Sequence, residues 1–152
     1  MKRFQFRLAR VQRLRERTLQ ERQVELAEVI EHQQKIEAEI SRLDSDRTGE
    51  KDSLRDYLGQ GTISIDHVIQ SHLYDGSLRN AKRQLESHLE QVRRLVDFRR
   101  ARVLDAEKDV KVLEKLGEKA RQRYDADVSR EDQQLLDELA LQSEQRRHYS
   151  EG

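Results

Sequence analysis

The sequence lacks several residues that shape compact globular domains. Its 152 residues include no cysteine, no proline and no tryptophan, and only 5% are aromatic. Without cysteine the chain forms no disulfide and offers no thiolate to a metal ion. No uncharged apolar run approaches the roughly 18 residues of a membrane span. The basic start continues into more arginine, so we expect no secretory signal and a cytoplasmic protein.

Charged residues take the place of the missing types. They make up 39% of the chain against 34% hydrophobic residues, and 30 cations balance 30 anions. An ordinary globular domain is about half apolar. Leucine, glutamate, arginine, glutamine, lysine and alanine dominate, and all of them favour helix. This composition predicts long helices that bury a narrow apolar seam, as in a coiled coil.

Apolar residues recur in alternating steps of three and four along both halves of the chain. In the first half, six of eight such seam positions are apolar: Leu19, Arg22, Leu26, Val29, Gln33, Ile36, Ile40 and Leu43. In the second half, eleven of fourteen are apolar: Leu78, Lys82, Leu85, Leu89, Val92, Val96, Arg99, Val103, Ala106, Val110, Leu113, Gly117, Ala120 and Tyr124. Heptad spacing of this kind winds a helix left-handedly against a partner helix.

Gly59 and Gly61 interrupt the helical pattern between the two halves. We therefore predict an all-α fold of one domain (1–152), an antiparallel coiled-coil hairpin with helix 1 at about 3–58, a turn at about 59–64 and helix 2 at about 65–148. The weak heptad phase over residues 44–50 predicts a local irregularity in the first helix.

The position of the turn also predicts the register of the hairpin. If residue 58 lies opposite residue 65, partner numbers sum to about 123. Arg99 then lies near Glu21 and Glu25, and Lys82 near Glu37 and Asp44. Residues 121–148 overhang, so the apolar residues of that stretch have no partner within the hairpin.

No motif for catalysis or cofactor binding is visible. The phosphate-binding pattern GxxxxGK[ST] is absent. His32 and His88 approach one another at the predicted register and are candidates for a metal site, although solvated histidines beside the seam are the commoner arrangement. We expect no cofactor, no resident metal and no enzymatic activity.

The two ends of the chain carry opposite charge. Residues 1–22 hold eight cations and two anions, a net charge of +6, and residues 125–144 hold one cation and seven anions, a net charge of −6. Three interpretations remain open at this point: an anionic partner such as nucleic acid or membrane, partial neutralisation within the chain, or a protein that binds both ends. Apolar residues around the turn, such as Ile63 and Leu73, indicate either a second docking site or local packing.

Both ends resemble signatures of a known family. "FQFRLARVQRLRE" (4–16) resembles the N-terminal signature of the flagellar FliJ family, and "LEKLGEKARQRYDADVSREDQQLLDELA" (113–140) resembles its C-terminal signature. Gln12, Gly76, Gly117 and Gln134 depart from the family pattern.

The resemblance implies a non-enzymatic component of the flagellar type III export apparatus, peripheral to the cytoplasmic face of the inner membrane. Such proteins are two-helix coiled coils like the central stalks of rotary ATPases. They bind the hexameric export ATPase and promote its assembly and activity. They also contact the membrane export gate and export chaperones.

By this resemblance we expect a chain that is monomeric alone and binds no nucleic acid. The residues expected to contact the ATPase are Phe6, Arg7, Leu8, Val11, Arg15, Tyr124, Gln133, Leu136, Asp137 and Leu139. Those expected to contact the gate or chaperones are Tyr57, Leu58, His72, Leu73 and Tyr74. The alternatives are the equivalent stalk of a virulence injectisome, a homodimeric coiled-coil scaffold, and a nucleic-acid or membrane binder.

Overall fold

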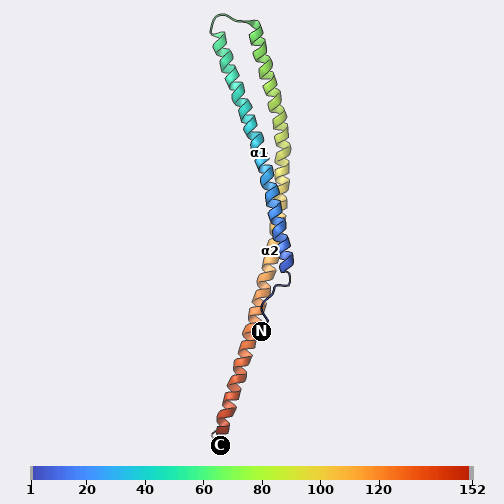
Figure 1. Cartoon of the computed structure of the whole chain (residues 1–152), viewed down its shortest axis with the longest axis vertical. Helices are drawn as coiled ribbons and strands as arrows, with labels where there is room; N and C mark the ends of the chain where they lie inside the picture. The colour runs from blue at the N-terminus through green and yellow to red at the C-terminus, as the bar shows by residue number, and fades with distance from the viewer. Residues whose placement is uncertain (1, 151–152) are drawn as a thin grey trace. The chain divides into compact units, whose positions relative to one another are not determined.

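The chain folds into two long helices. The computed structural model describes residues 2–150, so Met1, Glu151 and Gly152 lie outside the described residues. Helix α1 spans Ala9–Leu58 and helix α2 spans Ile65–Ser150, with no strand among the described residues. The two helices pack against each other in antiparallel directions (Figure 1), which confirms the predicted all-α hairpin.

The connection between the helices is stabilised at both sides. The Gly59 amide donates to the carbonyls of Arg55 and Asp56 at 3.1 and 3.2 Å. Gly61 has φ +83°, in the left-handed region that glycine adopts without strain. The Ser64 amide then donates to the Tyr57 hydroxyl at 2.8 Å, and α2 begins at the next residue. Asp66 lies in the first turn of α2, where its negative charge interacts favourably with the positive end of the helix dipole.

Helix α1 begins six residues later than the predicted start at residue 3. Residues 2–6 adopt no regular secondary structure and residues 7 and 8 form a turn; we call residues 2–8 the N-terminal strap. The Ala9 amide donates to the Phe6 carbonyl at 3.1 Å. In an extended chain, residues two apart point to the same side, whereas in a helix they diverge. Only the extended strap therefore brings both Phe4 and Phe6 onto α2.

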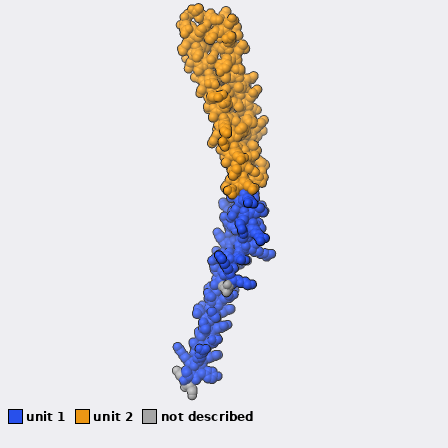
Figure 2. Space-filling view, viewed as in Figure 1, with its two compact units in different colours: residues 1–19, 105–152 blue, residues 20–104 orange. Residues whose placement is uncertain are grey.

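The chain divides into two compact units (Figure 2). Within the described chain, unit 1 contains residues 2–19 and 105–150, and unit 2 contains residues 20–104. Unit 2 includes the turn and the parts of both helices that adjoin it. Unit 1 includes the strap, the first turns of α1 and the remainder of α2.

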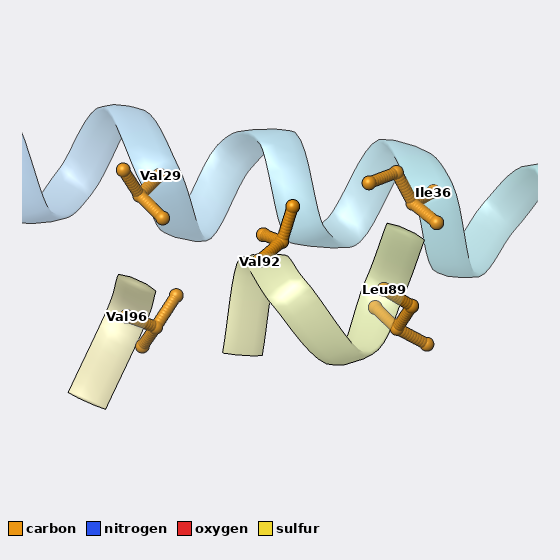
Figure 3. Packing of buried hydrophobic residues seen from close by; sticks show 5 residues of the cluster. All are labelled: Val29, Ile36, Leu89, Val92 and Val96. Atoms are coloured by element: carbon orange, nitrogen blue, oxygen red, sulfur yellow. The ribbon is translucent and has the colours of Figure 1, made fainter. Parts of the chain in front are cut away.

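A continuous apolar cluster fills the helix interface of unit 2. Val29 and Ile36 of α1 point toward Leu89, Val92 and Val96 of α2 (Figure 3), and each is 4–7% exposed. Val92 lies between the two α1 side chains along the interface. Burying one such side chain contributes about 1.5–3 kcal/mol, so this cluster is a main source of stability in unit 2.

The predicted seam is the observed interface. All 22 seam positions of the two halves are buried or half-buried. Arg99 donates to the backbone carbonyl of Glu25 at 2.7 Å. Lys82 lies 2.8 Å from the Asp44 carboxylate, and the resulting hydrogen bond raises the pKa of the lysine. These contacts confirm the predicted register.

The predicted irregularity over residues 44–50 is wrong. Helix α1 continues without a break to Leu58. The seam continues there with polar residues: Arg47 donates to Asp75 at 2.9 Å, and the Ser71 hydroxyl donates to Glu50 at 2.7 Å. The hydrogen bond from Arg47 lowers the pKa of Asp75, partial burial opposes that shift, and Arg79 and Lys51 reinforce it. The heptad pattern is weak over residues 44–50 because polar residues that pair across the interface replace apolar ones there, and the helix itself is regular.

Candidate protein-docking surfaces

The strap is held on α2 by aromatic contacts. The ring of Phe6 lies over Gly117, with its nearest carbon 3.6 Å from where a β-carbon would stand. The rings of Phe4 and Tyr124 lie 5.4 Å apart. The Arg121 guanidinium lies 5.2 Å from the centre of the Phe4 ring and 6.0 Å from that of Tyr124, within the range of cation–π attraction.

A hydrogen bond completes this attachment. The Tyr124 hydroxyl donates to the carbonyl of Lys2 at 2.8 Å. An open groove lies along the contact, lined by the strap on one side and by α2 residues such as Leu116 and Asp127 on the other. The groove mixes aromatic, cationic and anionic groups, which suits a protein partner better than a small apolar ligand.

The first turns of α1 present an exposed cationic face. Arg10, Arg13 and Arg17 are exposed and form no ion pair within the described part of the chain. Apolar side chains are exposed beside them, with Val11 at 40% and Leu14 at 60%. Exposed arginines next to exposed aliphatic side chains are typical of surfaces that bind other proteins.

Helix α2 continues beyond the strap, and no other part of the described chain packs on its last turns. Every residue from 129 to 150 is exposed. Leu135, Leu136, Leu139 and Leu141 are 54–61% exposed. At 3.6 residues per turn, Leu135 and Leu139 lie on the same side of the helix as Tyr124 and Val128, so they extend the buried seam as an open stripe. We call residues 125–150 the overhang.

Exposed apolar side chains also surround the turn in unit 2. Leu58, Ile63, Ile65, Ile69, Leu73 and Tyr74 are 44–74% exposed, and we call residues 57–74 the tip. His72 is exposed as well. Tyr57 differs from these, because its hydroxyl accepts from Ser64 and its ring lies 4.1 Å from that of His67. Tyr57 is therefore half-buried and helps to hold the turn.

The structure brings together only some of the residues expected to contact the ATPase. Phe6, Arg7, Leu8 and Tyr124 line the same groove. Val11 lies on the first turns of α1, and Arg15 pairs there with Asp109 at 3.5 Å. The remaining four, Gln133, Leu136, Asp137 and Leu139, lie on the overhang, where Gln133 donates to Asp137 at 3.0 Å.

Sequence reasoning missed two residues of this surface, Phe4 and Arg121. The signal for Phe4 was its spacing of two from Phe6, which fits an extended segment and not the helix that we predicted. Arg121 had no distinct signal, because a charged residue on a charged helix resembles all its neighbours. The structure gives it a role by placing it against two aromatic rings.

Comparison with known families identifies the chain. A family profile described as Flagellar FliJ protein matches residues 4–148, nearly the whole chain. The chain belongs to the FliJ family. Neither the curated proteins nor the solved structures gave a significant match. FliJ proteins are non-enzymatic components of the flagellar export apparatus, which assigns the chain to that system. In the described residues, no helix is long and apolar enough to cross a membrane.

Proposed function

We propose that this FliJ-family chain is a stalk-like partner of the hexameric export ATPase and that unit 1 is the part that binds the ring. The single observation that carries this proposal is the uncovered leucine stripe of the overhang. A solvent-exposed helix normally shows polar residues on its open face. An apolar stripe that extends a buried seam favours a partner that covers it.

Charge supports a protein partner over a generic anion. The cationic first turns of α1 and the anionic overhang both belong to unit 1, and the whole chain has a net charge of zero. A nucleic acid or an anionic membrane would attract the first and repel the second. A ring of subunits presents both signs of charge and apolar side chains, so it can contact both surfaces.

The proposed ATPase contacts fall into two groups. Phe6, Arg7, Leu8, Val11, Arg15 and Tyr124 belong to the strap and the helix segments beside it. Gln133, Leu136, Asp137 and Leu139 belong to the overhang. Phe6, Tyr124 and Arg15 of the first group already contact other residues of unit 1, so they hold the strap and the start of α1 in place. Leu136 and Leu139 of the second group are exposed and offer apolar area for binding.

The tip is the proposed contact for the export gate or for export chaperones. Leu58, Leu73 and Tyr74 are 44%, 69% and 48% exposed, and His72 is exposed beside them. Tyr57 acts there through the conformation of the turn. This assignment gives unit 2 a function separate from that of unit 1.

The proposal is tested by measuring ATP turnover and ring assembly of the export ATPase with and without this chain. Stimulation by the wild type supports the proposal. The variant Leu136→Asp with Leu139→Asp is expected to bind the ATPase at least about tenfold more weakly. Each substitution replaces an apolar side chain that loses its water on binding with a charged carboxylate.

Matched controls come from exposed aliphatic residues of unit 2. Val24 of α1 and Leu104 of α2 are both 53% exposed, close to the values for the overhang leucines. Val24→Asp with Leu104→Asp is expected to stimulate the ATPase as the wild type does. Equal loss in both double variants, or no stimulation by a helical wild-type chain, contradicts the proposal.

A further inference from the structure

Two histidines from different helices meet in unit 2. His32 of α1 and His88 of α2 place their Nε2 atoms 3.3 Å apart, and their rings are nearly perpendicular at 73° with centres 5.4 Å apart. Both side chains are exposed to solvent. They lie 56 residues apart in the chain, so only the register of the hairpin brings them together.

The separation of the two nitrogens matches a specific coordination geometry. Zinc holds imidazole nitrogens at about 2.0–2.1 Å in a tetrahedral arrangement, which places two such ligands about 3.3 Å apart. A square-planar ion would hold adjacent nitrogens at about 2.8–2.9 Å. An N–H···N hydrogen bond of 3.3 Å is long in comparison with ordinary hydrogen bonds of about 2.7–3.2 Å.

We propose that His32 and His88 form a two-imidazole site for Zn²⁺ that joins α1 to α2. Both Nε2 atoms bind as neutral imidazoles, with the ring protons on Nδ1. A hydrogen bond between the two Nε2 atoms needs a proton on one of them, and the tautomers decide which ring donates. Zinc binding needs both Nε2 atoms free of protons, so a ring that donated from Nε2 would carry its proton on Nδ1 in the zinc-bound form.

The site is open on its solvent side. Within the described residues, no group of three or more histidine, cysteine, aspartate or glutamate side chains is arranged to hold a metal ion. Water therefore completes the tetrahedron, and the ion exchanges with solvent. Such a site binds less tightly than a closed structural zinc site with four protein ligands.

Binding at this position fixes the helix register. Val29 and Ile36 lie within about one turn of His32 on α1, and Leu89 and Val92 lie within about one turn of His88 on α2. A one-heptad slip of the helices would move the two imidazoles about 10 Å apart. The ion consequently binds only the native pairing and stabilises it by mass action.

The test is thermal unfolding of the full chain, followed by circular dichroism, with and without Zn²⁺. Saturating Zn²⁺ is expected to raise Tm by about 3–6 °C in the wild type, and a chelator is expected to reverse the rise. Mg²⁺ is expected to leave Tm unchanged, because it prefers oxygen ligands. Zinc titration is expected to show one site per chain.

The variants His32→Gln and His88→Gln are expected to abolish the rise and to weaken Zn²⁺ binding by at least about tenfold, since even the loss of an outer-shell partner costs 10–100-fold. Both side chains are exposed, so the variants keep the helical fold. His148→Gln, in the last turn of α2, is the matched control and is expected to respond as the wild type does. No Tm rise in the wild type, or an equal rise in His32→Gln and His88→Gln, overturns the proposal.

Discussion

Gly117 is the residue on which the ring of Phe6 rests. A β-carbon at this position would meet three carbons of that ring at 3.6–3.8 Å, which is ordinary van der Waals contact. Gly117→Ala therefore adds a contact and removes a glycine from a helix interior. We expect the free energy of unfolding to rise by about 0.5–1 kcal/mol, measured by urea denaturation.

Two other glycines serve as controls for that prediction. A β-carbon on Gly76 would meet nothing within 4 Å, so Gly76→Ala reports helix propensity alone and is expected to stabilise by a similar amount. Gly61 has φ +83°, and Gly61→Ala is expected to destabilise by about 1–2 kcal/mol. Destabilisation by Gly117→Ala would show that the Phe6 ring needs a bare backbone beneath it.

Asp75 links the stability of unit 2 to pH. Its pKa lies below the ordinary value of 3.8, chiefly because Arg47 donates a hydrogen bond to it. The stabilisation is therefore present above about pH 4 and is lost as the pH falls through the lowered pKa. Between pH 5 and pH 2.5, Tm of the wild type is expected to fall more steeply than that of Asp75→Asn.

The partner of Asp75 provides a second variant for the same experiment. Arg47→Gln removes the main group that lowers the pKa of Asp75, while Arg79 and Lys51 remain. The fall of its Tm with acid is therefore expected to lie between that of the wild type and that of Asp75→Asn. If the curves of Tm against pH run parallel for the wild type and both variants, the Arg47–Asp75 pair contributes nothing to the fall of Tm in acid.

Among the elements, the strap is held on α2 by a small set of contacts. These are the Phe6 ring over Gly117, the Phe4–Tyr124 pair with Arg121, and one hydrogen bond. Phe6→Ala is expected to increase tryptic cleavage after Arg3 and Arg7 by several-fold, because local opening exposes the backbone to protease. Phe6 lies outside both helices, so the helical content measured by circular dichroism is expected to stay unchanged.

Phe98 supplies the control for the strap experiment. It is 58% exposed on α2 in unit 2, so Phe98→Ala removes an aromatic ring without touching the strap. Its cleavage after Arg3 and Arg7 is expected to match that of the wild type. Equal cleavage in Phe6→Ala would show that the ring does not hold the strap.

The helices could be predicted from the sequence and the strap could not. The seam from Leu78 to Tyr124 follows a heptad repeat, and such a repeat depends only on helix geometry and apolar burial. Residues 2–8 have ordinary helix formers, so propensity favoured a helix there. Packing of Phe4 and Phe6 on α2 overrides that preference, and a single sequence shows no such tertiary contact.

The candidate docking surfaces were predictable to a similar extent. The open stripe at Leu135 and Leu139 follows from the hairpin register, because α2 is longer than α1. The contact of Arg121 with Phe4 depends on the strap conformation and was missed for that reason. Tyr57 stays a proposed docking residue, and its hydrogen bond with Ser64, which depends on the turn conformation, was not predicted.

The net charge of the chain is zero, although its surface carries separate cationic and anionic regions. The cationic start of α1 and the anionic overhang belong to unit 1, and the apolar tip belongs to unit 2. This distribution is the basis for our proposal that unit 1 binds the ATPase and that the tip binds the gate or chaperones.

The absence of cysteine permits the most direct test of that assignment. A single introduced cysteine is unique in the chain, so a photoreactive label on it reports one position. Labels at Val11→Cys and Leu139→Cys are expected to crosslink to the export ATPase, and labels at Leu73→Cys and Leu104→Cys are not. Crosslinks from Leu73→Cys without any from Leu139→Cys would contradict the account.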